Sequence, residues 1–176
     1  MNFFDAAIYD SIFKLSGTGT TIFMTFISHL GSAIPLILIT VGILIFSKGK
    51  GYSKLIAFNL ACSFIISQIL KLIIRRPRPE VLRLAVEKGF SFPSGHAMVS
   101  TVFYGFFIYL IYKKVKNKHI KWVSISLICI LILLIGVSRI YLGVHYASDV
   151  FGGFVLSISY LGLFTHIIKT TFKEVS

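Results

Sequence analysis

The sequence predicts an all-α membrane protein: a polytopic helix bundle of about five transmembrane helices, preceded by a short amphipathic helix at the N-terminus. The chain of 176 residues is 56% hydrophobic, with 17 Phe and only 14% charged residues. Its mean hydropathy is +0.87. A membrane-spanning helix needs about 20 predominantly apolar residues, and five runs in the sequence approach or exceed that length. We expect a single domain over residues 1–176.

The first element is expected at residues 2–15, where apolar side chains recur at helical spacing. Charged residues fall between them, as in a helix that lies in the membrane interface rather than spanning it. The apolar positions are Phe4, Ile8, Ile12 and Leu15, and the charged ones are Asp5, Asp10 and Lys14.

Five apolar runs follow, each predicted to be a membrane span. The first, residues 21–46, contains Gly31 and Pro35, so it is expected to be kinked or to begin as an interfacial segment. The others are residues 55–74, 95–112, 122–141 and 145–168. Cys62 and Cys129 lie inside such runs, and we expect neither a disulfide nor a metal site from them.

The net charge of +12 comes from Lys and Arg in short segments between the apolar runs, a pattern of membrane flanks rather than of a nucleic-acid-binding face. Ten lysines would share one side: Lys48, Lys50, Lys54, Lys113, Lys114, Lys116, Lys118, Lys121, Lys169 and Lys173. The other side has Lys14, Arg75, Arg76, Arg78, Arg83, Lys88 and Arg139. The positive-inside rule then places the C-terminus in the cytoplasm and the Arg-rich segment 75–93 on the extracytoplasmic face.

The first polar cluster is KLIIRRPRP, residues 71–79. Pro77 and Pro79 stop the preceding helix, because the residue before a proline avoids the helical region. Lys71 is then one turn from the helix end, and Arg78 lies on a non-helical segment at the membrane edge. Taken alone, Lys71 could simply extend its ammonium to the headgroups, and the arginines could anchor anionic lipid.

The second cluster is Pro93-Ser94-Gly95-His96, where a new apolar run begins. Pro and Ser commonly start a helix, and on that reading His96 is incidental. A helix N-terminus with a glycine also attracts anions, since the backbone N–H groups can approach closely and the helix dipole favours negative charge. His96 would stand beside such an anion.

The third cluster is SRIYLGVHYASD, residues 138–149. Arg139 ends the fourth span, and His145 and Asp149 are four residues apart at the start of the fifth, so one helix face is expected to carry both. A carboxylate there can hold one imidazole nitrogen and leave the other free, as in a catalytic triad. An ionisable residue inside an apolar helix marks a functional site by default. The alternative is a structural His–Asp hydrogen bond.

With five spans, all three clusters fall on one membrane face. Three basic residues there exceed the need of a single carboxylate but suit a phosphate. The sequence shows no Asp/Glu cluster and no Cys/His ligand spacing, so we expect no metal and no cofactor. Metal-free phosphoryl transfer needs a nucleophile, a general acid and fixed positive charge, and the three clusters supply each.

These motifs resemble those of the type 2 phosphatidic acid phosphatase family, metal-independent membrane lipid phosphatases related to vanadium haloperoxidases. The family signature is present in full, as Lys71…Arg78-Pro79, Pro93-Ser94-Gly95-His96 and Ser138-Arg139…His145…Asp149. Many bacterial members have six spans, and the first of these has no counterpart among the five predicted here.

The resemblance implies a role for each matched residue. His145 would attack phosphorus and form a phosphohistidine, and Asp149 would orient it. His96 would protonate the leaving oxygen and then activate water. The phosphate oxygens would be held by Lys71, Arg78, Ser94, Gly95 and Arg139. Two histidines in opposite protonation states predict a bell-shaped pH profile.

The implied function is a multi-pass cell-membrane phosphatase acting on a lipid phosphate or diphosphate at the extracytoplasmic face, with membrane lipid and no nucleic acid as partner. By analogy the preferred substrate is undecaprenyl diphosphate, which would be converted to undecaprenyl phosphate. Phosphatidylglycerophosphate and phosphatidic acid are the alternatives. A lipid or antibiotic transporter is a remote alternative, since transport needs no His–Asp pair beside a second histidine. A vanadate-dependent haloperoxidase is disfavoured by the membrane setting.

Overall fold

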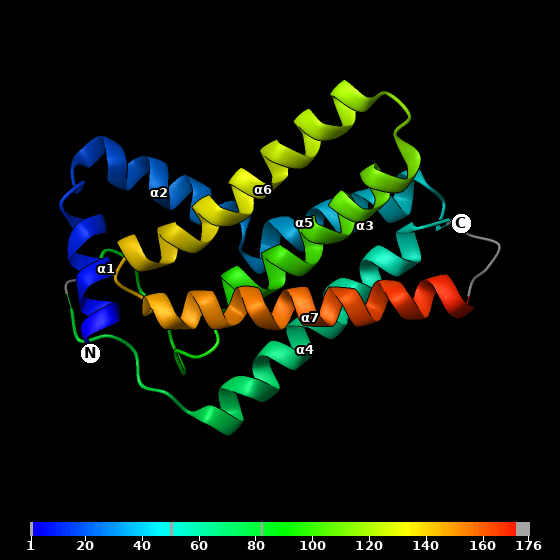
Figure 1. Ribbon diagram of the computed structural model, residues 1–176. Coiled ribbons are helices and arrows are strands. Elements are labelled where there is room, and N and C mark those ends of the chain that lie inside the picture. Colours follow the sequence, from blue (N-terminus) through cyan, green and yellow to red (C-terminus); the bar gives the residue numbers. More distant parts are fainter. Residues whose placement is uncertain (1, 50, 82, 172–176) are drawn as a thin grey trace.

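The computed structural model describes residues 2–49, 51–81 and 83–171, and within these ranges every regular element is a helix (Figure 1). The seven helices are α1 (Phe3–Phe13), α2 (Thr18–Leu30), α3 (Ala33–Phe46), α4 (Ser53–Ile74), α5 (Gly95–Lys114), α6 (Lys118–Tyr141) and α7 (Ala147–Thr171). Helices α4 to α7 are each long and apolar enough to cross a membrane. The predicted all-α membrane bundle is therefore confirmed.

The first expected span is divided in two. Helices α2 and α3 meet at a 46° bend and count as a fifth span only if taken together. The break follows Leu30, as Gly31 predicted, and a Cβ on Gly31 would lie 2.5 Å from the Ile135 side chain of α6. Pro35 lies in the first turn of α3, where its missing N–H costs no hydrogen bond. Gly31 thus lets the bent pair pack closely on α6.

Two expectations about helix ends and faces were wrong. The fifth span begins at Ala147, so His145 lies in the preceding turn and not on the helix. Asp149, in the first turn of the helix, accepts from the Tyr146 N–H just before it through Oδ2 at 3.0 Å, as the third residue of a capping box does. The second concerns one residue of α1: Asp5, expected on the polar face of an amphipathic helix, is 1% exposed within the bundle.

Close packing at glycines positions the helix starts that carry the motifs. A Cβ on Gly153 of α7 would lie 3.3 Å from the Ser94 carbonyl, and the Ser94 N–H donates to the Asp149 carbonyl at 3.2 Å. A Cβ on Gly136 of α6 would lie 2.4 Å from the Phe154 ring of α7. The backbones of α5, α6 and α7 therefore approach closely next to the motif residues.

The bundle has two distinct ends (Figure 1). The α6–α7 turn, α1 and the start of α5 lie together at one end, on the left of the view. The α3–α4 and α5–α6 connections and the end of α7 lie at the other. All three motif clusters are at the first end, whereas most of the lysine segments are at the second.

Candidate active site

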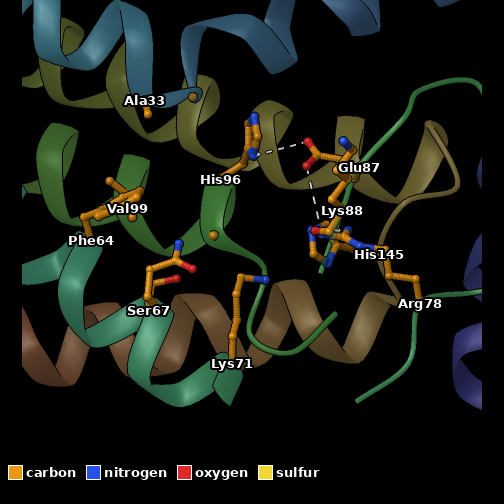
Figure 2. A pocket seen from close by; sticks show the side chains of 13 residues that line it. Ala33, Phe64, Ser67, Lys71, Arg78, Glu87, Lys88, His96, Val99 and His145 are labelled. Carbon is orange, nitrogen blue, oxygen red and sulfur yellow. Dashed lines mark hydrogen bonds and ion pairs between the residues drawn. The ribbon is translucent and has the colours of Figure 1, made fainter. Parts of the chain in front are cut away.

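A cavity of about 180 Å³ lies among the motif residues (Figure 2). Five of the eight predicted site residues line it: Lys71, Arg78, Gly95, His96 and His145. The other three, Ser94, Arg139 and Asp149, are almost completely buried next to it. The structure thus brings all eight residues together from four helices and two connecting segments.

His145 is held between Asp149 and Arg78. Its Nδ1 lies 3.6 Å from Asp149 Oδ2, and Ser91 Oγ bridges the two, donating to that carboxylate at 2.5 Å and lying 3.4 Å from Nδ1. Nε2, on the other side of the ring, lies 3.2 Å from Arg78 Nη1. A donor at that distance favours the tautomer in which Nε2 carries a lone pair.

Burial lowers the pKa of His145 to about 3. The hydrogen bond to Asp149 opposes this change, and the nearby positive charges of Arg139, Arg78 and Lys71 reinforce it. The ring is therefore neutral at neutral pH, as a nucleophile must be.

Arg78 is fixed by the backbone of two segments. Its guanidinium donates to the Gly89 carbonyl at 3.0 Å, to the Lys88 carbonyl at 2.8 Å and to the Val144 carbonyl at 2.8 Å. Burial lowers the pKa of Arg78, but a guanidinium stays protonated in proteins. The segment after Pro77 therefore presents a fixed cation at the face of His145.

The start of α5 forms another wall of the cavity. Ser94 caps the helix by accepting from the Ala97 N–H at 3.5 Å, and Lys71 Nζ donates to the Phe90 carbonyl at 2.8 Å. A Cβ on Gly95 would meet the Lys71 side chain only at 3.7 Å. The nearest atom to such a Cβ is Ser67 Oγ at 3.6 Å, so no atom of the described residues crowds Gly95.

Arg139 is buried behind the cavity. Its Nη1 donates to Ser28 Oγ and its Nη2 to Glu87 Oε1. Within the described residues its Nε is buried with no hydrogen-bond partner. A buried cation with an unused donor is suited to an anion that is not part of the chain.

Sequence reasoning missed two groups in this site. Glu87 lies beside His96, with its carboxylate 4.0 Å from His96 Nδ1 and 4.0 Å from Arg78 Nη2 (Figure 2). Ser91, which bridges His145 and Asp149, lies just before the Pro93-Ser94-Gly95-His96 motif but belongs to no motif. Only their position on the segment between two motif clusters could have drawn attention to them.

The chain was compared with known families and proteins. A sequence model of the PAP2 superfamily matches residues 52–173. Phosphatidylglycerophosphatase B of Bacillus subtilis (strain 168) is 36% identical over 140 residues, which cover 77% of this chain and 68% of that protein. Lipid phosphate phosphatase delta of Arabidopsis thaliana is 26% identical over 137 residues, covering 68% of this chain and 32% of that protein.

Two solved structures share the fold. One is the crystal structure of a transmembrane PAP2 type phosphatidylglycerolphosphate phosphatase from Bacillus subtilis, with a TM-score of 0.82 and 30% identity over 94% of this chain and 85% of that one. The other, LpxE of Aquifex aeolicus, has a TM-score of 0.72 and 24% identity over 94% and 99% of the two chains. At that identity LpxE supports the fold alone.

Proposed function

Because the chain belongs to the PAP2 superfamily and is a multi-pass membrane lipid phosphatase, we propose that it hydrolyses phosphatidylglycerophosphate through a phosphohistidine at His145. The observation that carries the mechanism is the neutral, buried His145, whose Nε2 meets Arg78 in a cavity shared with His96. A nucleophile, an acid and fixed cations lie within one small volume.

The first half of the proposed reaction transfers phosphorus to the protein. His145 Nε2 attacks in line, a P–N bond forms, and the P–O bond to the lipid breaks. His96 gives its proton to the departing lipid oxygen. Asp149, with Ser91, holds the Nδ1 side of the His145 ring and balances the positive charge that the ring gains.

The second half releases phosphate. His96, now neutral, takes a proton from water as that water attacks phosphorus, and the P–N bond breaks. Throughout, Lys71, Arg78 and Arg139 with the Gly95 amide face the negative charge on the phosphoryl oxygens, as fixed donors do in other phosphoryl transfers.

The substrate proposal rests on the relatives. The named phosphatidylglycerophosphatase is 36% identical, and a phosphatidylglycerolphosphate phosphatase shares the fold with a TM-score of 0.82. This supports a glycerophospholipid monophosphate ahead of undecaprenyl diphosphate. The undecaprenyl diphosphate prediction has no comparable support and stays a prediction.

We also propose that the site opens on the extracytoplasmic face, because most of the lysine-rich connections lie at the opposite end of the bundle (Figure 1). An exposed residue on the segment after α4, Glu80, can report this. In a background without Cys62 and Cys129, the variant Glu80→Cys should react with an impermeant maleimide added to intact cells. Protection until the cells are lysed would place the site in the cytoplasm.

The activity is tested with protein purified in detergent, measuring phosphate release in the presence of EDTA. The substrates are phosphatidylglycerophosphate, phosphatidic acid and undecaprenyl diphosphate, and the control is His145→Ala. We expect fastest release from phosphatidylglycerophosphate, with no release by the variant. Full activity in His145→Ala would overturn the phosphohistidine, and faster release from undecaprenyl diphosphate would overturn the substrate order.

A further inference from the structure

A carboxylate outside the three motifs is buried behind the catalytic face. Asp5, on α1, accepts from the Ser148 N–H at 2.8 Å, from Ser148 Oγ at 2.9 Å and from Arg76 Nη2 at 3.0 Å. Its side chain is fully buried. A charge is seldom buried without a partner, and these contacts fix α1 to the start of α7.

Arg76 links this carboxylate to the proposed catalytic one. Its Nη2 meets Asp5, while its Nη1 donates to Asp149 Oδ1 at 2.6 Å and to Ser148 Oγ at 2.8 Å. The guanidinium also lies 4.1 Å from the centre of the Tyr146 ring. Arg76 is therefore held from three sides, with each arm of its fork on a different carboxylate.

As a result, the two oxygens of the Asp149 carboxylate have different partners. Arg76 occupies Oδ1, and the other oxygen, Oδ2, accepts from Ser91 Oγ and the Tyr146 N–H and faces His145 Nδ1. The Arg76 carbonyl also accepts from the Ser91 N–H at 2.8 Å, so one residue steadies both the carboxylate and the serine that bridges it to the ring. A shift of Arg76 would turn Oδ2 away from His145.

We propose that Asp5 and Arg76 are positioning residues of the active site, holding Asp149 in the orientation that in turn holds His145. The inference rests on the proposed function, because it assigns a purpose to the orientation of His145. It predicts that a residue on the first helix of the chain controls a step at the start of the last one.

The charges alternate along this chain of contacts, which gives the two residues opposite effects on His145. Losing Arg76 leaves the negative charge of Asp149 less balanced, which favours a protonated ring. Losing the Asp5 charge leaves Arg76 less balanced, which disfavours it. The other groups around His145 stay in place in both cases: Lys71 of α4, Arg78 and Glu87 of the segment after α4, His96 of α5 and Arg139 of α6.

The experiment compares Arg76→Gln, Arg76→Lys and Asp5→Asn with wild type, using full-length protein and the phosphatidylglycerophosphate assay. Matched controls are Arg75→Gln and Asp10→Asn, since Arg75 and Asp10 are exposed neighbours on the same segments. For each variant, kcat, KM and the pH dependence of kcat/KM from pH 4 to 8 are measured. Thermal unfolding in detergent reports whether each variant is folded.

We expect Arg76→Gln to lower kcat by about tenfold to a hundredfold with KM changed less than about twofold, as for other residues that orient a catalytic group. In its pH profile of kcat/KM, the fall in rate on the acid side (the acid limb) should move to higher pH, because the His145 ring is protonated more readily. Asp5→Asn should lower kcat less, without an upward shift of the limb. Arg76→Lys keeps the charge and should restore the limb and part of kcat. The double variant Asp5→Asn/Arg76→Gln should be no slower than Arg76→Gln, because both act through one contact chain.

The inference is overturned if folded Arg76→Gln retains wild-type kcat, if the variants change KM alone, if no limb moves, or if the two losses simply add. These outcomes are distinct from failure of the proposed function. The proposed function fails if wild-type protein itself releases no phosphate, or if His145→Ala remains active.

Discussion

Two carboxylates outside the family motifs each hold an arginine of the active face, and they do so in opposite ways. Glu87 contacts Arg139 from the cavity wall, and its side chain is 29% exposed. Asp5 holds Arg76 from behind, with a side chain that is 0% exposed and accepts three hydrogen bonds. The first is an anion among cations in an open cavity, which a phosphate could replace. In the second pair the carboxylate is fully buried and the donors it accepts from, within the described residues, belong to the chain itself, although the Arg76 side chain is 28% exposed. The burial of the carboxylate therefore distinguishes an Arg–carboxylate pair that a ligand could replace from one that holds two parts of the fold together.

The largest effect is expected for Arg139→Ala, which removes the arginine of the Glu87–Arg139 pair. This change removes a buried cation with an unused donor and takes from Glu87 the hydrogen bond that Arg139 donates to it. We expect kcat/KM to fall by about a hundredfold to a thousandfold, the usual cost of removing a fixed donor to a developing charge. Steady-state phosphate release measures it. A loss below about tenfold would mean that Arg139 serves packing rather than the phosphate.

The Asp5–Arg76 pair should contribute more to stability than the Glu87–Arg139 pair, because the Asp5 carboxylate is fully buried. Asp5→Ala leaves the Nη2 group of Arg76 and the Ser148 N–H without their acceptor, at a cost of about 2 kcal/mol after allowing for the partial exposure of Arg76. For a chain of this size that lowers Tm by about 4–8 °C. Glu87→Ala should lower Tm by less than Asp5→Ala in the same detergent. Its carboxylate is partly solvated and, within the described residues, accepts one hydrogen bond rather than three, although its loss leaves Arg139 Nη2 without an acceptor. Equal losses in the two variants would erase the distinction.

The variant Glu87→Gln tests whether a phosphate can replace the Glu87 carboxylate. If the Glu87 carboxylate competes with phosphate for Arg139 and Arg78, removing its charge should strengthen inhibition by inorganic phosphate by about tenfold. The control is Glu80→Gln, an exposed acidic residue on the same segment. An unchanged or weaker inhibition constant would show that Glu87 does not occupy the phosphate position.

The smallest expected effect concerns pH. The pKa of His145 is lowered to about 3, chiefly by burial, so the ring is already neutral across the range from pH 5 to 8. Protonation of His145 should then reduce kcat/KM only below pH 5, and the acid side of the bell predicted from the two histidines lies lower than an ordinary imidazole would give. The rate is measured with substrate concentration well below KM. An acid limb near pH 6.5 that Arg76→Gln leaves in place would contradict this assignment.

The sequence was sufficient for the helices and for the meeting of the motif residues, because the relevant signals are local. Apolar runs fix the spans, Pro77 and Pro79 end α4, and Ser94 caps α5. Once the number of spans is known, the three clusters must share a face. The catalytic roles of His145, His96 and Asp149 remain predictions until they are tested.

The supporting residues could not be predicted because their contacts are distant in sequence. Asp5 and Arg76 are 71 residues apart, and Glu87 and Arg139 are 52 apart. Helical periodicity placed Asp5 on the polar face of an amphipathic helix, which is correct for an isolated helix. The tertiary structure covers that face with Arg76 and Ser148, and no local pattern specifies such a partner.

The close approach of α6 and α7 at Gly136 limits which residues can stand at that position. It lies one turn before Arg139, and a Cβ there would come within 2.8 Å of Val150 as well as meeting Phe154. A methyl group at this position would push apart the two helices whose neighbouring turns carry Arg139 and Asp149. In a random screen for lost activity, Gly136→Ala would be grouped with the phosphate-site variants although the residue does not line the cavity. Steric constraint on substitution therefore extends from the cavity into the packing of α6 on α7 behind it.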